Sequence, residues 1–221
     1  MKDLFRFWAW WTRDYAYALV WQVRALVNRV HPDSFLTGTR TPVVVLPGIY
    51  ETWKFMQPLI EQLHAQGHPV HVVADLRRNH RPVTEMAEHV ETYLRNNDLE
   101  DVLLVAHSKG GLTGKVVMAG PAGDRVRGML AVATPFGGSR YARAMPLRSL
   151  RAFSSRDATI TSLARQTTVN GRIVSVYARF DPHIPGGSEL PGATNVMLDT
   201  GGHFRVLGHP GVLAELATFA D

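Results

Sequence analysis

The sequence predicts an α/β fold, a mainly parallel sheet of about six strands with helices on both faces. Short, continuous apolar runs alternate with segments of helical length along most of the chain, as expected for strands that are buried on both faces. Ser108, Asp181 and His203 each come just after such a run, at the sheet edge where ligands gather. The chain has 221 residues, 45% of them hydrophobic, which suits one domain with a sizeable core.

Composition excludes several kinds of site. The chain has no cysteine, so disulfides and thiolate metal sites are absent. Its ten histidines are scattered, without a pair four residues apart on a predicted helix, so we expect neither a metal nor an organic cofactor. The net charge of +5 favours acidic neighbours. Nucleic acid is not expected, because no basic tract is longer than Arg77-Arg78 and no recognition motif is present.

Residues 1–36 form an N-terminal segment that is rich in tryptophan and tyrosine and is predicted to be a long helix with a following loop. At about 100° per residue, four basic side chains fall within roughly 40° of one line, a stripe typical of a helix at a membrane surface: Lys2, Arg6, Arg13 and Arg24. Charges interrupt every apolar window, and no cleavage site is evident, so neither a transmembrane span nor a secretory signal is expected. We therefore expect a cytoplasmic protein that either contacts a membrane peripherally or docks this helix on its own domain or on a second copy.

Residues 37–221 contain the remaining predicted elements. The apolar runs predict strands at 42–46, 70–74, 102–106, 129–133, 173–178 and 196–199. Between and after them, the patterns predict helices at 54–65, 83–96, 109–119 and 210–219. No internal repeat is visible.

The strand predicted at 102–106 leads directly into a turn at Ser108. Ala106 and Gly110, two positions before and after Ser108, are small, as a sharp strand-to-helix turn with a strained central residue requires. Such a turn exposes the Ser108 hydroxyl. The next helix begins at Lys109, whose N–H is then placed where an oxyanion would be stabilised, and Gly111 lets helix and strand pack closely.

This segment resembles the nucleophile elbow of the α/β-hydrolase superfamily, in particular that of small bacterial lipases and esterases with an Ala-His-Ser-x-Gly-Gly motif. Ala106 replaces the common first glycine, and Lys109 stands where many of these enzymes have an apolar residue. The resemblance implies Ser108 as nucleophile, the Lys109 N–H as an oxyanion donor and His107 as part of the substrate site. The alternative is that Ser108 only caps a helix of some other doubly wound sheet.

Two further turns fit the same resemblance. The first strand ends at Pro47-Gly48, where the superfamily usually has His-Gly, and the resemblance places the second oxyanion donor at the Ile49 N–H with Tyr50 lining the pocket. The turn at 134–139 resembles a lipase turn that shapes the acyl pocket, so Phe136 is expected there. Residues 140–170 interrupt the alternation and form a small predicted cap or lid. Its arginines face either an anionic interface or solvent: Arg140, Arg143, Arg148, Arg151, Arg156 and Arg165.

The acid and base follow in the order expected of this superfamily. Asp181, after the strand at 173–178, matches the position of the acid that orients an imidazole, and His203 in a glycine-rich loop matches the base. Asp199 is the alternative acid and His209 the alternative base, whereas His183 is expected to shape the loop.

The resemblance therefore implies a serine hydrolase that cleaves carboxylic esters or lipids through Ser108, His203 and Asp181. The alternative is a catalytically idle binding module that the N-terminal helix attaches to a membrane or a partner. Every candidate catalytic residue follows Thr37, so we expect a chain that begins near Thr37 to keep its activity on a soluble ester. The acyl chain, the alcohol and the oligomeric state are not determined by the sequence.

Overall fold

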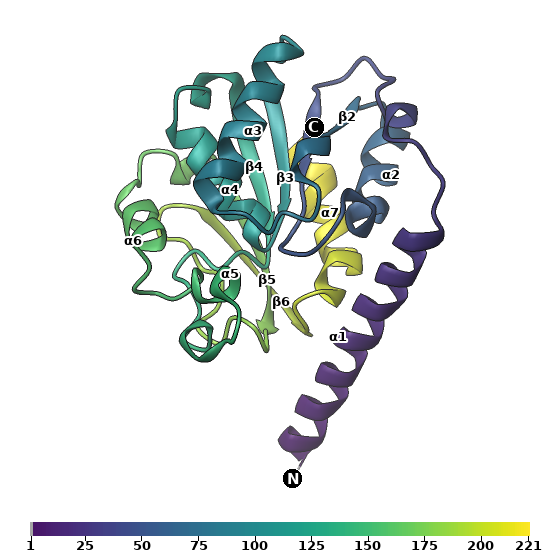
Figure 1. The fold of residues 1–221 in the computed structure, drawn as a ribbon. Coiled ribbons are helices and arrows are strands. Elements are labelled where there is room, and N and C mark those ends of the chain that lie inside the picture. The colour runs from purple at the N-terminus through teal and green to yellow at the C-terminus, as the bar shows by residue number, and fades with distance from the viewer. Residues whose placement is uncertain (1) are drawn as a thin grey trace.

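The computed structural model describes residues 2–221, with side chains from residue 8 onward except that of Arg148. The side chains of Lys2, Arg6 and Arg148, named above, lie outside the described ones. One parallel sheet runs through the molecule in the order β2-β1-β3-β4-β5-β6 (Figure 1). Its strands are β1 Val43–Leu46, β2 Val70–Val72, β3 Val102–His107, β4 Val126–Val132, β5 Ile173–Phe180 and β6 Thr194–Gly201. The predicted six-stranded parallel sheet is confirmed.

Helices cover both faces of the sheet because successive strand residues point to opposite sides. Val44 and Leu46 of β1 belong to one apolar cluster, and Val43 and Val45 belong to the other. The first cluster is covered by α3 Val83–Asn96, α4 Lys109–Ala119 and α6 Ala158–Arg165. The second is covered by α2 Gln57–Ala65, α7 Pro210–Ala220 and part of α1 Lys2–Val27.

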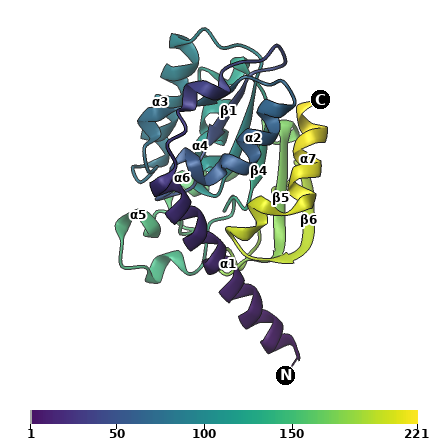
Figure 2. The same ribbon diagram turned by 90° about the vertical axis from the view of Figure 1, so that its right-hand side faces the viewer.

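The long helix α1 packs against its own domain and extends past the sheet at its N-terminal end (Figure 2). Tyr17 and Trp21 pack against the second apolar cluster, and the ring of Trp10 stacks on Phe180 at the end of β5, with the ring centroids 6.0 Å apart. The helix therefore docks on its own domain, one of the outcomes that the sequence left open. No helix in the described part of the chain has the length and hydropathy of a membrane span.

The segment 140–170 divides into two parts. Ile160 and Leu163 of α6 are buried in the first apolar cluster, so the second half of the segment belongs to the main fold. The first half contains a short 3-10 helix at Ala142–Ala144 and α5 Arg148–Arg151, and Ala142, Met145, Leu150 and Phe153 line the pocket described below. Only this first half has the position of a cap.

Candidate active site

Ser108 occupies a strained turn between β3 and α4. Its φ of 50° and ψ of −117° are unusual for a residue with a side chain, and such strain persists only where the surroundings enforce it. Gly110 and Gly111 allow that packing: a Cβ atom on Gly110 would lie 2.0 Å from the Leu46 carbonyl oxygen, and one on Gly111 would lie 2.0 Å from Thr134 Oγ1. The small residues of the motif are thus required by the neighbouring segments.

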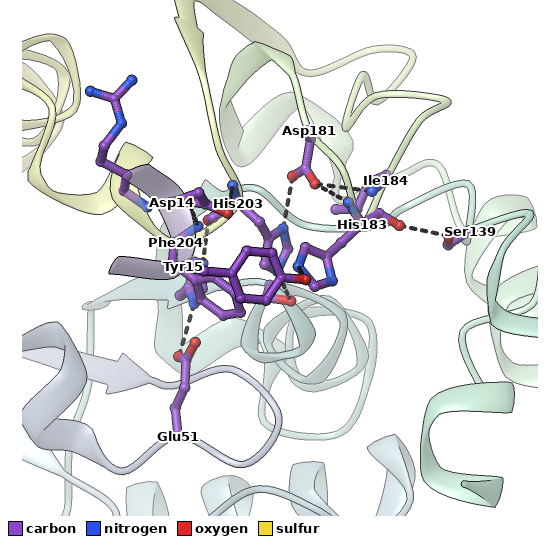
Figure 3. A network of polar contacts seen from close by, with 12 residues as sticks. Asp14, Tyr15, Glu51, Ser139, Asp181, His183, Ile184, His203 and Phe204 are labelled. Atoms are coloured by element: carbon purple, nitrogen blue, oxygen red, sulfur yellow. Dashed lines mark hydrogen bonds and ion pairs between the residues drawn. The ribbon is translucent and has the colours of Figure 1, made fainter. Parts of the chain in front are cut away.

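His203 and Asp181 complete a continuous hydrogen-bonded chain with Ser108. His203 Nδ1 lies 2.7 Å from Asp181 Oδ2, and His203 Nε2 lies 2.9 Å from Ser108 Oγ. A carboxylate only accepts, so Nδ1 is the donor, and in the neutral ring Nε2 then accepts from the Ser108 hydroxyl. The other oxygen of Asp181 accepts the N–H groups of His183 and Ile184, at 2.7 and 3.0 Å (Figure 3). Three residues far apart in the sequence therefore meet in the order and geometry of a nucleophile, a base and an acid.

The charges of the site favour an ionised Asp181 beside His203. Burial by itself lowers the pKa of His203, but Asp181 raises it by charge and by hydrogen bond, and the net pKa is raised. Burial by itself raises the pKa of Asp181, but His203 and the N–H of His183 lower it, and the net pKa is lowered. Burial and the neighbouring His203 lower the pKa of His183 to about 4.

The alternative acid and base lie elsewhere. Asp199 is exposed and pairs with Arg179, with Arg179 Nε 2.9 Å from Asp199 Oδ1. His209 caps α7, where its Nδ1 accepts the N–H of Gly211 at 3.0 Å. Neither side chain contacts Ser108 or His203, so the geometry favours Asp181 and His203.

Two backbone N–H groups are available beside Ser108. Lys109 is the first residue of α4, so its N–H has no acceptor within the helix. Among the described residues, the Ile49 N–H donates to no backbone carbonyl, whereas the next N–H, that of Tyr50, donates to the Arg78 carbonyl oxygen at 2.7 Å. Glu51 Oε2 accepts the Gly48 N–H at 2.7 Å and holds this loop in place. Among the described residues, neither the Ile49 N–H nor the Lys109 N–H donates to a backbone carbonyl, so both are free to act as the oxyanion donors that the resemblance implies.

The side chain of Lys109 has a structural explanation. Its ammonium is buried and donates to the Asn79 carbonyl oxygen at 2.7 Å, to Asn79 Oδ1 at 3.0 Å, and to the Arg81 carbonyl oxygen. Asn79 in turn donates to the Pro47 carbonyl oxygen at 2.6 Å. Lys109 therefore connects the start of α4 to the loop that precedes Ile49, which accounts for a lysine at this position.

A pocket of about 420 Å³ opens above Ser108. Its lining is mainly apolar and comes from α1, from the loop at 49–51, from the first half of the segment 140–170 and from the loops of the acid and base. Ile49 and Tyr50 line it, as expected. Tyr15, Ala18 and Gln22 of α1 also line it, so the N-terminal helix forms one wall of the site.

His107 and Phe136 do not line this pocket, which corrects the expectation for both. His107 is fully buried and lies 2.8 Å from Glu51 Oε2 through Nδ1 and 3.0 Å from the His203 carbonyl oxygen through Nε2. Phe136 is buried in the first apolar cluster, and Pro135 and Ser139 of the same turn face the pocket instead. Strand and turn directions decide these positions, because neighbouring side chains point to opposite sides.

Sequence reasoning missed two buried carboxylates. Glu51 pairs with His107, and Asp14 of α1 accepts the N–H groups of His203, Phe204 and Arg205. One signal existed for Asp14, since it is the single acidic residue between positions 4 and 32. No group of three or more His, Asp or Glu side chains in the described part of the chain is arranged to hold a metal ion.

Comparison with solved structures places the fold. The Bacillus licheniformis lipase BlEst2 superposes with a TM-score of 0.64 at 17% identity, over 86% of this chain and 95% of that one. MGS-MChE2, an α/β-hydrolase enzyme from a lagoon-sediment metagenome, superposes with a TM-score of 0.60 at 16% identity, over 82% of this chain and 90% of that one. A deformylase from Pseudomonas putida superposes with a TM-score of 0.60 at 15% identity, over 82% of this chain and 93% of that one. No protein-family model and no curated protein matches the sequence. The structural likenesses show that the chain has the α/β-hydrolase fold.

Proposed function

We propose that this chain, which has the α/β-hydrolase fold, is a serine hydrolase that cleaves carboxylic esters. The hydrogen-bonded chain Ser108–His203–Asp181 carries the proposal, because it joins a strained, pocket-facing hydroxyl to an imidazole whose other nitrogen is held by a buried carboxylate. The similar structures include a lipase and a deformylase, and they support hydrolysis more broadly than the choice of an ester.

In the first half of the reaction, Ser108 Oγ attacks the ester carbonyl carbon while His203 Nε2 takes the hydroxyl proton. The charge that develops on the carbonyl oxygen is stabilised by the N–H groups of Ile49 and Lys109. Asp181 stabilises the imidazolium. The carbon–oxygen bond to the alcohol then breaks, His203 protonates the leaving oxygen, and an acyl group remains on Ser108.

In the second half, water enters the place of the alcohol. His203 takes one of its protons as the oxygen attacks the acyl carbon, and the same two N–H groups hold the second oxyanion. Collapse of this intermediate breaks the bond to Ser108 Oγ, which regains its proton from His203. The acid is released and the site returns to its starting state.

The pocket indicates the kind of substrate. Its walls are mainly apolar, with Met145, Leu150 and Phe153 of the cap facing Ile184 and Phe204 of the acid and base loops. A volume of about 420 Å³ is in the range of small-ligand sites, so we infer esters with an apolar acyl or alcohol group.

Labelling with a fluorophosphonate tests the proposal. Ser108 Oγ should displace fluoride from the reagent and form a stable adduct on the wild-type chain, and the Ser108→Ala variant should remain unlabelled. In a separate assay, the untreated wild-type chain should hydrolyse a short chromogenic ester faster than the matched thioester or amide. A folded wild-type chain that takes up no reagent would contradict the proposal and favour the idle binding module.

A further inference from the structure

Asp14, in the middle of α1, is fully buried and points at the backbone of the loop that contains His203 (Figure 3). Its Oδ2 accepts the His203 N–H at 2.9 Å, and its Oδ1 accepts the N–H groups of Phe204 and Arg205, each at 2.8 Å. Three N–H donors satisfy a buried carboxylate, and bonds to a charged acceptor are stronger than neutral ones. The contact therefore holds the backbone at residues 203–205 against the helix.

The backbone of His203 is held from both sides. Asp14 accepts its N–H, and His107 lies 3.0 Å from its carbonyl oxygen through Nε2. With Asp181 holding the ring, the position of Nε2 relative to Ser108 depends on all three contacts. A displacement of about 1 Å in such a group is enough to slow a reaction about a hundredfold.

The two glycines before His203 fit the approach of α1. A Cβ atom on Gly201 would lie 2.4 Å from the ring of Trp10, and one on Gly202 would lie 2.5 Å from Asp14 Oδ1. Tyr15 adds a second link, with its hydroxyl oxygen 3.1 Å from His183 Nε2. The glycine-rich loop is thus shaped to receive the helix.

We propose that Asp14 is a positioning residue for the base His203 and that α1 is for this reason part of the active site. The proposal rests on the proposed function and changes one expectation from the sequence. A chain that begins near Thr37 lacks Asp14 and the wall formed by Tyr15, Ala18 and Gln22, so it should lose activity on soluble esters as well.

The Asp14→Asn variant of the full chain tests this role. An asparagine keeps one acceptor oxygen but presents an NH₂ group to the remaining N–H donors, so part of the contact is lost. We expect kcat to fall by about tenfold to a hundredfold with little change in KM. The charge of Asp14 contributes to the raised pKa of His203, so the rise of rate with pH should also shift to lower pH in the variant. A residue that only stabilised the fold would not move this profile.

Asp33→Asn is the matched control, because Asp33 lies in the same N-terminal segment but is exposed, and among the described side chains its carboxylate pairs only with His31. If Asp14→Asn and Asp33→Asn differ by less than about twofold in kcat, and their pH profiles coincide, the proposal is wrong. Gly201→Ala tests the same contact by a change in the loop, because its methyl group would push Trp10 and α1 away from the loop. It should reproduce the loss of kcat, and enlarging the space with Trp10→Ala should restore part of it.

Hydrogen exchange of the wild-type chain provides a test that needs no variant and no activity. The N–H groups of His203, Phe204 and Arg205 should exchange at least about a hundredfold more slowly than exposed loop amides. Rapid exchange at all three would overturn the proposal even for an active enzyme. If these three N–H groups exchange slowly but a fluorophosphonate does not label the chain, the result contradicts the proposed function and leaves the contact of Asp14 with the loop supported.

A second inference concerns the exposed apolar side of α1, which borders the pocket at Tyr15. At about 100° per residue, five apolar side chains fall within roughly 120° of one another, and we call them the outer face of α1. They are Trp11, Tyr15, Leu19, Val23 and Leu26, which are 39%, 40%, 65%, 50% and 77% exposed. Such a row of exposed apolar side chains marks an interaction surface.

This outer face continues onto the cap across the mouth of the pocket. Tyr15 of α1 and Met145 of the cap both line the pocket, and Tyr141 and Leu147 of the cap are about half exposed. Both views place α5 in the part of the molecule toward which α1 runs from its C-terminal end (Figures 1 and 2). The mouth thus opens between two exposed apolar borders.

Among the described side chains of residues 8–30 and 140–156, the exposed charged groups are all arginines. Residues 8–30 contain three arginines and one acid, the buried Asp14, and residues 140–156 contain five arginines and neither Asp nor Glu. A second copy would bring like charges together at such a face, whereas anionic lipid headgroups complement them. From these observations we propose that the outer face of α1 and the cap dock on an anionic lipid surface, with the pocket opening toward it.

Co-sedimentation with vesicles tests this docking in the unlabelled Ser108→Ala chain. We expect binding to vesicles that contain phosphatidylglycerol, less binding to phosphatidylcholine alone, and weakening by salt. Leu19→Gln with Val23→Gln should reduce binding by roughly tenfold or more, because apolar area is lost. Met197→Gln is the control, since Met197 is 52% exposed on β6. Equal vesicle binding by the Leu19→Gln, Val23→Gln double variant and the Met197→Gln control would overturn the lipid proposal. It would also be overturned if the wild-type chain is a dimer and the double variant is a monomer.

Discussion

Glu51 and His107 form a buried hydrogen-bonded pair directly beneath the base, with Glu51 Oε2 2.8 Å from His107 Nδ1. The other ring nitrogen of His107 faces the His203 carbonyl oxygen, which can only accept. The ring of His107 therefore joins the Glu51 carboxyl group to the backbone of His203. Since Glu51 also accepts the Gly48 N–H, one carboxylate links the loop of Ile49 to the backbone of His203.

Glu51→Gln should destabilise the protein. It replaces the buried carboxyl group that contacts both the His107 ring and the Gly48 N–H, and disrupting buried hydrogen bonds from one side costs about 1–3 kcal/mol. Urea denaturation at neutral pH measures the change. Glu61→Gln on the exposed side of α2 should change the free energy of unfolding by less than about 0.5 kcal/mol. Equal stability of the two variants would show that the pair contributes nothing.

Ser108→Ala and His203→Ala should each reduce kcat for a short chromogenic ester by about 10⁴-fold or more, with the double variant little worse. The reason is that the two residues perform one proton transfer together. Steady-state kinetics of the three variants, with circular dichroism to verify folding, provides the measurement. Losses that add independently would contradict a shared mechanism.

Asp181→Asn should reduce kcat severely, because an amide no longer fixes the tautomer of His203 or stabilises its cation. Asp199→Asn should leave kcat almost unchanged, since Asp199 pairs only with Arg179 at the surface, and exposed pairs contribute little. Comparing kcat for these two variants tests the assignment. The opposite ranking would move the acid to the end of β6.

Activity should rise with pH through the pKa of His203. The base must be neutral to accept the Ser108 proton. Because Asp181 raises the pKa of His203 above its usual value, activity should be low at pH values near and below that raised pKa. His183, with a pKa of about 4, stays neutral over this range and adds no second step. The pH dependence of kcat/KM measures this. Undiminished activity below about pH 5 would exclude His203 as the base.

The sequence by itself determined the sheet and which polar residues follow its strands. Continuous apolar runs are a local property of buried parallel strands, so all six strands could be predicted, with small errors such as the start of β4 at Val126. The elbow around Ser108 is local as well. The positions of Asp181 and His203 followed from strand order, because successive parallel strands end at the same edge of a sheet.

Tertiary structure alone decided which side chains surround those residues. Asp14 lies 189 positions before His203, and only the angle at which α1 crosses the domain brings its carboxylate to the loop. The partner of His107 and the burial of Phe136 likewise depend on which way a side chain points once the segments pack. Sequence patterns describe one segment at a time, whereas these contacts join segments whose relative placement is set by the packing of the whole core.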